Sequence, residues 1–213
     1  MPQMRRAIRN AARTLATFFR LSLVGLILLV TAFRIQAQTP PEDEKGHWTL
    51  SLWAAAETGE ENTNSFAESQ IWSAGAGAGR VLTHERGSGW RRGSLEYAFD
   101  VVPVFRSYGN QHVYGGGFDP VMFRWNSSKR WFGFSPYIGG AGGVLLTSSD
   151  LPPGKTSSIN AMAKAGGGVY VHTRKKQVLD IGVCWSHISN ANTGPRNPEF
   201  NGIQVSIGYR WIK

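Results

Sequence analysis

The sequence predicts an all-β protein, an eight-stranded antiparallel transmembrane β-barrel preceded by a cleaved signal peptide. Two observations carry this prediction. Beyond residue 46 the chain repeatedly alternates apolar and polar residues, which is the period of a strand with two different faces. Before that point it has a basic lead and a single short apolar run, the arrangement of an export signal. We therefore divide the chain into a signal peptide (1–37), a short periplasmic segment (38–46) and the barrel (47–213).

The N-terminal segment is too short in its apolar part to span a membrane. The uncharged run from Leu21 to Phe33 has 13 residues, whereas a spanning helix needs about 20. Small residues follow at Ala32 and Ala37, and we expect cleavage after Ala37, before a polar, Pro-rich stretch. The alternative is an uncleaved membrane anchor, and Arg34 is the residue that supports it.

Eight segments of the barrel region alternate and are separated by turn-rich stretches. In the clearest of them Leu95, Tyr97, Phe99 and Val101 share one face. The expected strands are 47–57, 68–82, 91–105, 112–125, 133–147, 158–172, 176–189 and 202–212. With an even number of strands both chain ends lie on one side, which export makes the periplasm. The connections after the first, fifth and seventh strands then face outward and are mostly longer, as is usual in outer-membrane barrels.

Three features indicate that the apolar face points to lipid and the polar face to a narrow lumen. The polar face is rich in glycine, as at Gly75, Gly77, Gly79, Gly166 and Gly168. It carries charges of both signs, at Glu96, Asp100, Arg124, Lys164, Asp180 and Arg210. Aromatic residues gather near strand ends, at Trp48, Trp90, Trp125, Trp131, Tyr209 and Trp211, as in interfacial girdles. The alternative is a secreted, lipocalin-like barrel with the polar face outside.

Charge and composition exclude several classes of function. The chain has 23 Lys and Arg and 14 Asp and Glu, but six arginines lie in residues 1–37, and the rest of the chain carries only +3. We expect no nucleic-acid partner, because a binder would carry its excess charge in the folded part. Cys184 is the sole cysteine, and the histidines outside the seventh strand are scattered, so we expect no metal site and no cofactor. The sequence leaves a homodimer open.

The seventh strand ends in a cluster of residues that could catalyse a reaction. His187 and Ser189 continue the lipid-facing phase of Val183 and Trp185. Residues i and i+2 share a face about 6.6 Å apart, so the imidazole can reach the hydroxyl and form a nucleophile–base pair. Polar residues entering the headgroup zone at a strand end would give the same pattern without any catalysis.

The 25 residues from His187 to Trp211 resemble the C-terminal part of the lipid A 3-O-deacylase family, acyloxyacyl hydrolase-like barrels of the outer membrane. The family motif His-x-Ser-Asn-Ala matches His187, Ser189, Asn190 and Ala191. The resemblance implies an eight-stranded hydrolase that removes an ester-linked acyl chain from lipopolysaccharide. It makes Ser189 the nucleophile and His187 the general base, and places the oxyanion hole near Asn190.

The third catalytic member departs from the family pattern. The family has a glutamate at the start of the last strand, after a glycine and a hydrophobic residue, and here Gln204 follows Gly202 and Ile203. Gln204 could orient the histidine but would face the lumen by phase. Glu199 shares the outward phase and is the other candidate. If neither serves, we expect either a weak enzyme or a non-catalytic structural or interaction barrel of the same family.

Overall fold

A computed structural model describes residues 45–59, 70–108, 112–151 and 156–213. The expected signal peptide, its cleavage site and residues 38–44 of the periplasmic segment lie outside these ranges, so they stay predictions. Within the described ranges no helix is long and apolar enough to cross a membrane.

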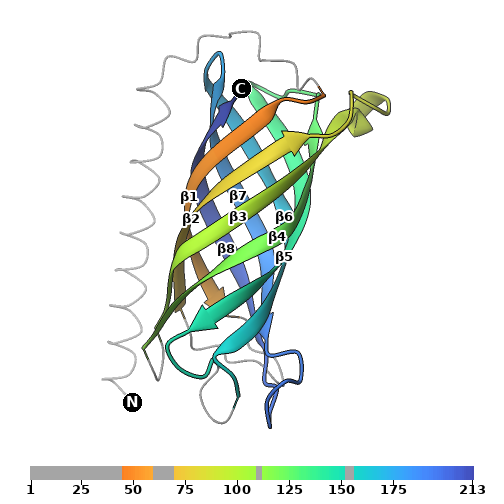
Figure 1. Cartoon of the computed structure of the whole chain (residues 1–213). Coiled ribbons are helices and arrows are strands. Elements are labelled where there is room, and N and C mark those ends of the chain that lie inside the picture. The colour runs from red at the N-terminus through yellow and green to blue at the C-terminus, as the bar shows by residue number, and fades with distance from the viewer. Residues whose placement is uncertain (1–44, 60–69, 109–111, 152–155) are drawn as a thin grey trace, which may run out of the picture. The chain divides into compact units, whose positions relative to one another are not determined.

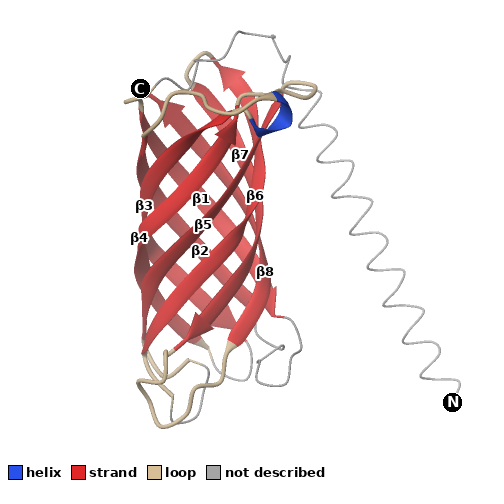
Figure 2. Ribbon diagram, turned by 90° about the vertical axis from the view of Figure 1, so that its right-hand side faces the viewer, coloured by secondary structure: helices blue, strands red, loops and turns tan. Residues whose placement is uncertain are grey.

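The described chain forms a closed barrel in which each strand pairs antiparallel with its neighbours and β1 closes against β8 (Figures 1 and 2). Eight strands were predicted, and eight are observed within three residues of the expected limits. A short 3-10 turn, η1 (Gly89–Arg91), lies between β2 and β3. The strands are β1 (Trp48–Gly59), β2 (Gln70–Val81), β3 (Gly93–Tyr108), β4 (Val113–Ser127), β5 (Phe134–Thr147), β6 (Ile159–Arg174), β7 (Gln177–Ser189) and β8 (Phe200–Ile212).

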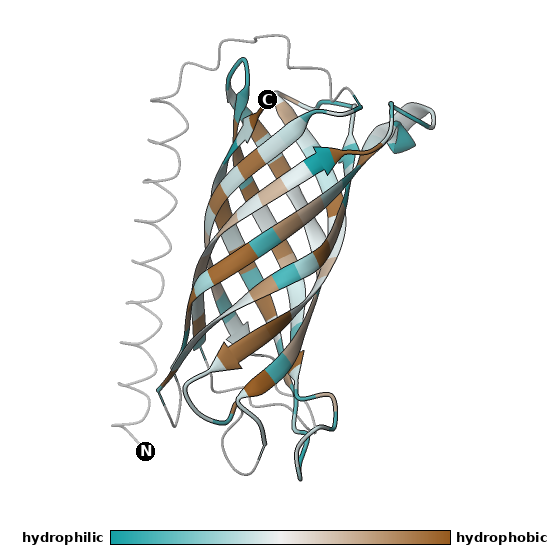
Figure 3. Cartoon of the chain, in the orientation of Figure 1, coloured by the Kyte–Doolittle hydropathy of each residue, from teal (hydrophilic) through white to brown (hydrophobic). Residues whose placement is uncertain are grey.

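The two faces of the strands are those of a membrane barrel. In β3, Glu96 and Asp100 are buried, whereas Tyr97, Phe99 and Val101 are exposed. Colouring by hydropathy shows apolar residues along the strands and hydrophilic ones in the connecting loops (Figure 3). A soluble barrel would bury the apolar set, so this pattern confirms the membrane interpretation and excludes the lipocalin-like alternative.

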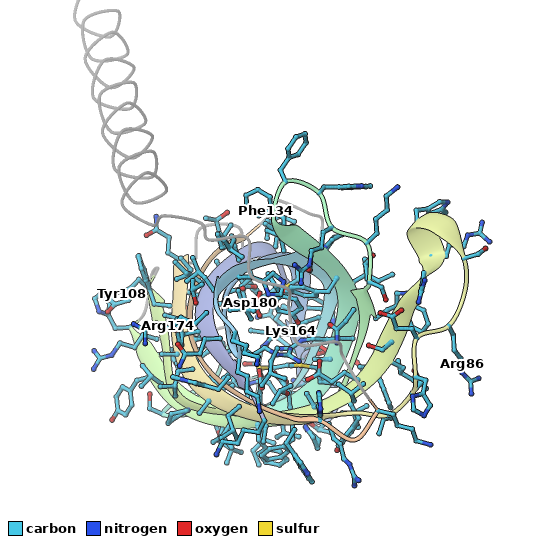
Figure 4. All side chains as sticks on the ribbon, turned by 90° about the horizontal axis from the view of Figure 1, so that it is seen from above. Arg86, Tyr108, Phe134, Lys164, Arg174 and Asp180 are labelled. Atoms are coloured by element: carbon cyan, nitrogen blue, oxygen red, sulfur yellow. The ribbon has the colours of Figure 1, made fainter. Side chains whose placement is uncertain are left out.

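Glycine makes room in the lumen for charged side chains. A Cβ on Gly77 would overlap Asp100 Oδ1, and one on Gly79 would overlap Glu96 Oε1. Glu96 forms a fully buried ion pair with Arg210. The side chains of the lumen crowd together when the barrel is viewed along its axis, with Lys164 and Asp180 in the middle (Figure 4). The predicted lumen of small residues and opposite charges is therefore confirmed.

Apolar clusters fill both ends of this polar lumen. At the end that holds the β7–β8 loop, the cluster is drawn from seven strands and one loop. Its members are Ile71, Phe105, Val113, Leu145, Leu151, Met162, Ile188 and Phe200. At the opposite end, Tyr170, Val178 and Ile212 pack with Tyr137. Between the clusters a cavity of about 110 Å³ remains, lined by Asp100, Lys164 and Asp180 among others.

Two prolines mark irregularities that alternation alone did not reveal. The β3–β4 register shifts between Val102 and Phe105, around Pro103, and the β4–β5 register shifts between Phe118 and Val121, around Pro120. Proline has no N–H for the ladder, so it is accommodated where pairing is interrupted. The first shift turns Phe105 into the lumen, where it joins the apolar cluster.

Candidate active site

The last residues of β7 place two polar side chains on the outward side of the barrel wall, where His187 is half-buried and Ser189 is buried. Ile188 is buried in the lumen cluster, so its neighbours His187 and Ser189 lie on the opposite, outward side, as their phase predicted. His187 Nε2 lies 3.0 Å from Ser189 Oγ. The expected contact between the imidazole and the hydroxyl is thus present.

The other nitrogen of the imidazole contacts β8. Asn201 is the cross-strand partner of His187, and its Oδ1 lies 2.8 Å from His187 Nδ1. Asn201 Nδ2 donates to Glu199 Oε2 at 3.2 Å. The same carboxylate oxygen lies 4.0 Å from His187 Nδ1. The chain of contacts therefore runs from Ser189 through His187 and Asn201 to Glu199.

This chain fixes the tautomer of the histidine. A carboxylate only accepts hydrogen bonds, so the Asn201 amide must turn its NH₂ to Glu199 and its carbonyl oxygen to His187. The carbonyl also only accepts, so His187 Nδ1 must carry a proton. His187 Nε2 then has a free lone pair that accepts from the Ser189 hydroxyl. That arrangement is the one a general base requires.

The two sequence candidates for the third member lie on opposite faces of the sheet. Glu199 lies outside and reaches His187 through Asn201. Gln204 faces the lumen, as its phase predicted, where its Nε2 donates to Glu57 Oε2 at 3.2 Å and its Oε1 lies 3.6 Å from Cys184 Sγ. The structure therefore brings Glu199 into the site and keeps Gln204 out of it.

Sequence reasoning missed Asn201, the residue in direct contact with the imidazole. Only the β7–β8 register reveals it, because that register pairs Asn201 with His187 across a loop of ten residues. The sequence could still have indicated its side of the sheet, because alternation along β8 puts Asn201 on the same outward face as Ile203 and Val205.

Asn190 organises the loop that follows the serine. Its backbone N–H donates to Asn197 Oδ1 at 3.0 Å and its Nδ2 donates to the Arg196 carbonyl at 2.7 Å. Its own carbonyl accepts from the Thr193 hydroxyl and N–H. The Asn190 N–H is therefore already engaged, and its bond to Oδ1 fixes the orientation of the Asn197 side-chain amide.

The side chains next to the pair on β6 are small and apolar. On β6, Ala161 lies opposite Ser189 and Ala163 opposite His187, both exposed. On the other side Trp185 stacks on the imidazole, with ring centroids 5.7 Å apart and planes at 23°. On β6 the pair has only methyl groups beside it, and Ser189 itself is 7% exposed. The indole ring limits the motion of the histidine.

A second Ser–His contact shows why proximity alone is insufficient. Ser135 Oγ lies 2.9 Å from His172 Nε2 near the other end of the barrel. His172 Nδ1 is buried without a hydrogen-bond partner, so nothing fixes its tautomer. The pair at the end of β7 differs in having both nitrogens engaged. In the described ranges no group of His, Cys, Asp and Glu could hold a metal ion.

Comparison with known proteins shows the fold of the chain. No family model and no curated protein matches the chain. The crystal structure of the outer membrane enzyme PagL superposes with a TM-score of 0.54 at 16% identity, covering 74% of this chain and 97% of that one. Neisserial surface protein A gives 0.52 at 18%, covering 78% and 99%. The protein is an eight-stranded barrel of the bacterial outer membrane.

Proposed function

We propose that the protein is an outer-membrane lipid esterase that hydrolyses an ester-linked acyl chain of lipid A. The observation that carries the proposal is the contact chain from Ser189 through His187 to Asn201, on the lipid-facing side of a strand end. The resemblance of residues 187–211 to the lipid A 3-O-deacylases supports the substrate class, and the fold is one that an outer membrane enzyme also has.

The mechanism follows from the protonation states that the contacts impose. His187 Nε2 takes the Ser189 proton as Oγ attacks the ester carbonyl carbon. His187 Nδ1 keeps its own proton and continues to donate it to Asn201 Oδ1. N–H donors of the β7–β8 loop hold the oxyanion, among them the side-chain amide of Asn197, which the Asn190 N–H orients. When the carbon–oxygen bond breaks, Nε2–H protonates the leaving sugar oxygen, which departs as a hydroxyl group. Water then attacks the acyl-serine with His187 again as base, releasing a fatty acid.

The location of the pair suits a substrate embedded in lipid. Ser189 lies at the barrel end opposite the start of β1 and the end of β8, so periplasmic termini place it at the outer leaflet, where lipid A resides. An acyl chain could pack against the exposed methyl groups of Ala161 and Ala163, which lie beside Ser189 and His187 on β6. The sugar and its phosphates would then lie toward the polar β7–β8 loop.

The alternative function is a structural or interaction barrel without catalysis. Asn201 favours it, because an amide beside the imidazole cannot neutralise the imidazolium as a carboxylate does. On that reading the carboxylate of Glu199, 4.0 Å away, is too remote to compensate.

The test is fatty-acid release from purified lipopolysaccharide by the barrel refolded in detergent, with Ser189→Ala alongside. We expect release that falls at least about 10³-fold in the variant. Ser186→Ala is the matched control, because Ser186 lies three residues away on the lumen side, and it should retain activity. Labelling of Ser189 by a fluorophosphonate reports the nucleophile independently of the substrate. A folded barrel that releases nothing from several lipid A types and resists the probe is the structural barrel.

A further inference from the structure

The two ends of the barrel differ sharply in charge. At the end where β1 begins and β8 ends, the described residues include eleven Lys and Arg side chains, here called the basic rim. The basic rim consists of Lys45, Arg80, Arg86, Arg91, Arg92, Lys129, Arg130, Arg174, Lys175, Lys176 and Lys213. Outside the lumen, the same part of the described chain carries a single acid, Glu85, which pairs with Arg92 at 2.7 Å. Outside the lumen, the described residues of the opposite end carry two charges of each sign, Arg106 and Arg196 with Asp150 and Glu199.

The acidic residues that precede the barrel in the sequence are too few to cancel the positive charge of the basic rim. Glu42, Asp43 and Glu44 come directly before Lys45 and lie outside the described residues. Counting all three with Glu85 still leaves eleven cations against four anions at this end. The basic rim therefore keeps a net positive charge when these acids are included, and it would attract an anionic surface.

Tryptophans place the basic rim at the membrane surface. Trp48, Trp90 and Trp131 are 53, 70 and 55% exposed, and Trp48 continues the outward apolar face of Leu50 and Leu52 on β1. Exposed tryptophan at the edge of a lipid-facing band marks the headgroup level. The β2–β3 loop with Arg86 projects outward from the barrel wall (Figure 4).

Each of these tryptophans carries a cation of the basic rim. Arg80 lies over Trp48 at 5.4 Å, Arg91 over Trp90 at 4.9 Å, and Lys129 over Trp131 at 5.7 Å, measured to the ring centroids. The three pairs come from three separate parts of the chain: β1 with β2, the β2–β3 loop and the β4–β5 turn. A ring fixed at headgroup depth thus holds its cation at the level of the lipid phosphates.

The tip of the β4–β5 turn adds an apolar group at the same end. Phe132 is 96% exposed and has a φ of 50°, a left-handed conformation that is unusual for a bulky residue. An exposed ring in this conformation is unfavourable both for the backbone and for hydration. Insertion of the ring among lipid chains would offset the second cost.

We propose that the basic rim binds the anionic phospholipid headgroups of the inner leaflet of the outer membrane. We take the occupant to be a lipid and not a soluble acidic protein, because Trp48, which holds Arg80, continues the lipid-facing surface of β1, and two further cations lie on exposed tryptophans at the same end. This inference stands apart from the proposed esterase, which uses the opposite end of the barrel.

The test measures lipid selectivity directly. The full chain is reconstituted in phosphatidylcholine bilayers with a trace of spin-labelled phosphatidylglycerol or spin-labelled phosphatidylcholine, and the immobilised fraction gives their relative association. We expect at least about threefold preference for phosphatidylglycerol, which falls in 1 M salt. The triple variant Arg91→Gln, Lys129→Gln, Lys175→Gln should lose most of it.

A charge-conserving variant separates charge from shape. Arg91→Lys, Lys129→Arg, Lys175→Arg keeps the three cations and should keep the preference. Circular dichroism and resistance to unfolding in detergent confirm that each barrel is folded. Equal association of the two lipids with the wild type would overturn the proposal and point to an acidic periplasmic partner instead. So would a neutralised variant that keeps the full preference.

Discussion

Replacing Asn201 by aspartate together with Glu199→Gln would move one negative charge inward along the contact chain. The double variant keeps the number of charges, and the aspartate has nearly the shape of the asparagine. Its carboxylate would occupy the position of Asn201 Oδ1, 2.8 Å from His187 Nδ1, in place of the present carboxylate at 4.0 Å. The paired substitution also avoids two adjacent carboxylates, which the single Asn201→Asp variant would create.

The expected gain follows from the two distances. At an effective dielectric constant of about 20, opposite unit charges attract by about 4 kcal/mol at 4.0 Å and about 6 kcal/mol at 2.8 Å. The His187 and Glu199 side chains are 22 and 39% exposed, so solvent reduces the difference of about 2 kcal/mol to about 1 kcal/mol. Stabilisation of the imidazolium should therefore raise kcat/KM about fivefold.

Two single variants complete the series. Glu199→Gln alone removes the charge. The attraction of about 4 kcal/mol, reduced by solvent to about 2 kcal/mol, is lost, so kcat/KM should fall about 30-fold. Asn201→Ala removes the acceptor that holds the Nδ1 proton and should cost about 10²-fold, because the reactive tautomer is no longer selected. The assay is fatty-acid release from lipopolysaccharide, with Gln204→Ala as the lumen-facing control that stays near wild type. If the double variant is slower than Glu199→Gln, the carboxylate does not act on His187 and the reasoning fails.

Two further predictions concern the lumen. Gly77→Ala should lower the free energy of unfolding by about 1–3 kcal/mol, because the new methyl overlaps Asp100 Oδ1. Gly142→Ala, whose Cβ would lie 4.0 Å from the nearest carbonyl oxygen, should change it by less than about 0.5 kcal/mol, and equal urea midpoints in detergent for the two would contradict the argument. Arg210→Met leaves Glu96 buried without its ion pair and should cost about 3–5 kcal/mol. Adding Glu96→Gln should recover part of that loss, and an unchanged midpoint for Arg210→Met alone would disprove it.

The fold was accessible from the sequence because each strand of a membrane barrel repeats the same two-residue rule. In β3, Glu96 and Tyr97 already show which face holds the charges and which meets lipid, and no knowledge of the neighbours is needed. The irregularities were not accessible. Pro103 and Pro120 show where pairing is interrupted, but the resulting turn of Phe105 into the lumen depends on the partner strand.

The site was predictable to the extent that it is local. His187 and Ser189 are two residues apart on one strand, so their contact follows from strand geometry alone. Asn201 is brought to His187 by the pairing of β7 with β8, and the length of the intervening loop does not set that register. The outward phase of Glu199 and the lumen phase of Gln204 were readable, whereas the amide inserted between Glu199 and the imidazole was not.

The outward position of Ser189 has a consequence for how the reaction would be measured. A substrate that reaches this hydroxyl arrives by diffusion in the plane of the bilayer and not from bulk water. The rate then depends on the number of substrate lipid molecules per unit area of membrane around the barrel. Diluting the membrane with inert lipid should slow turnover at a constant total amount of substrate, and diluting the suspension with buffer should leave it unchanged.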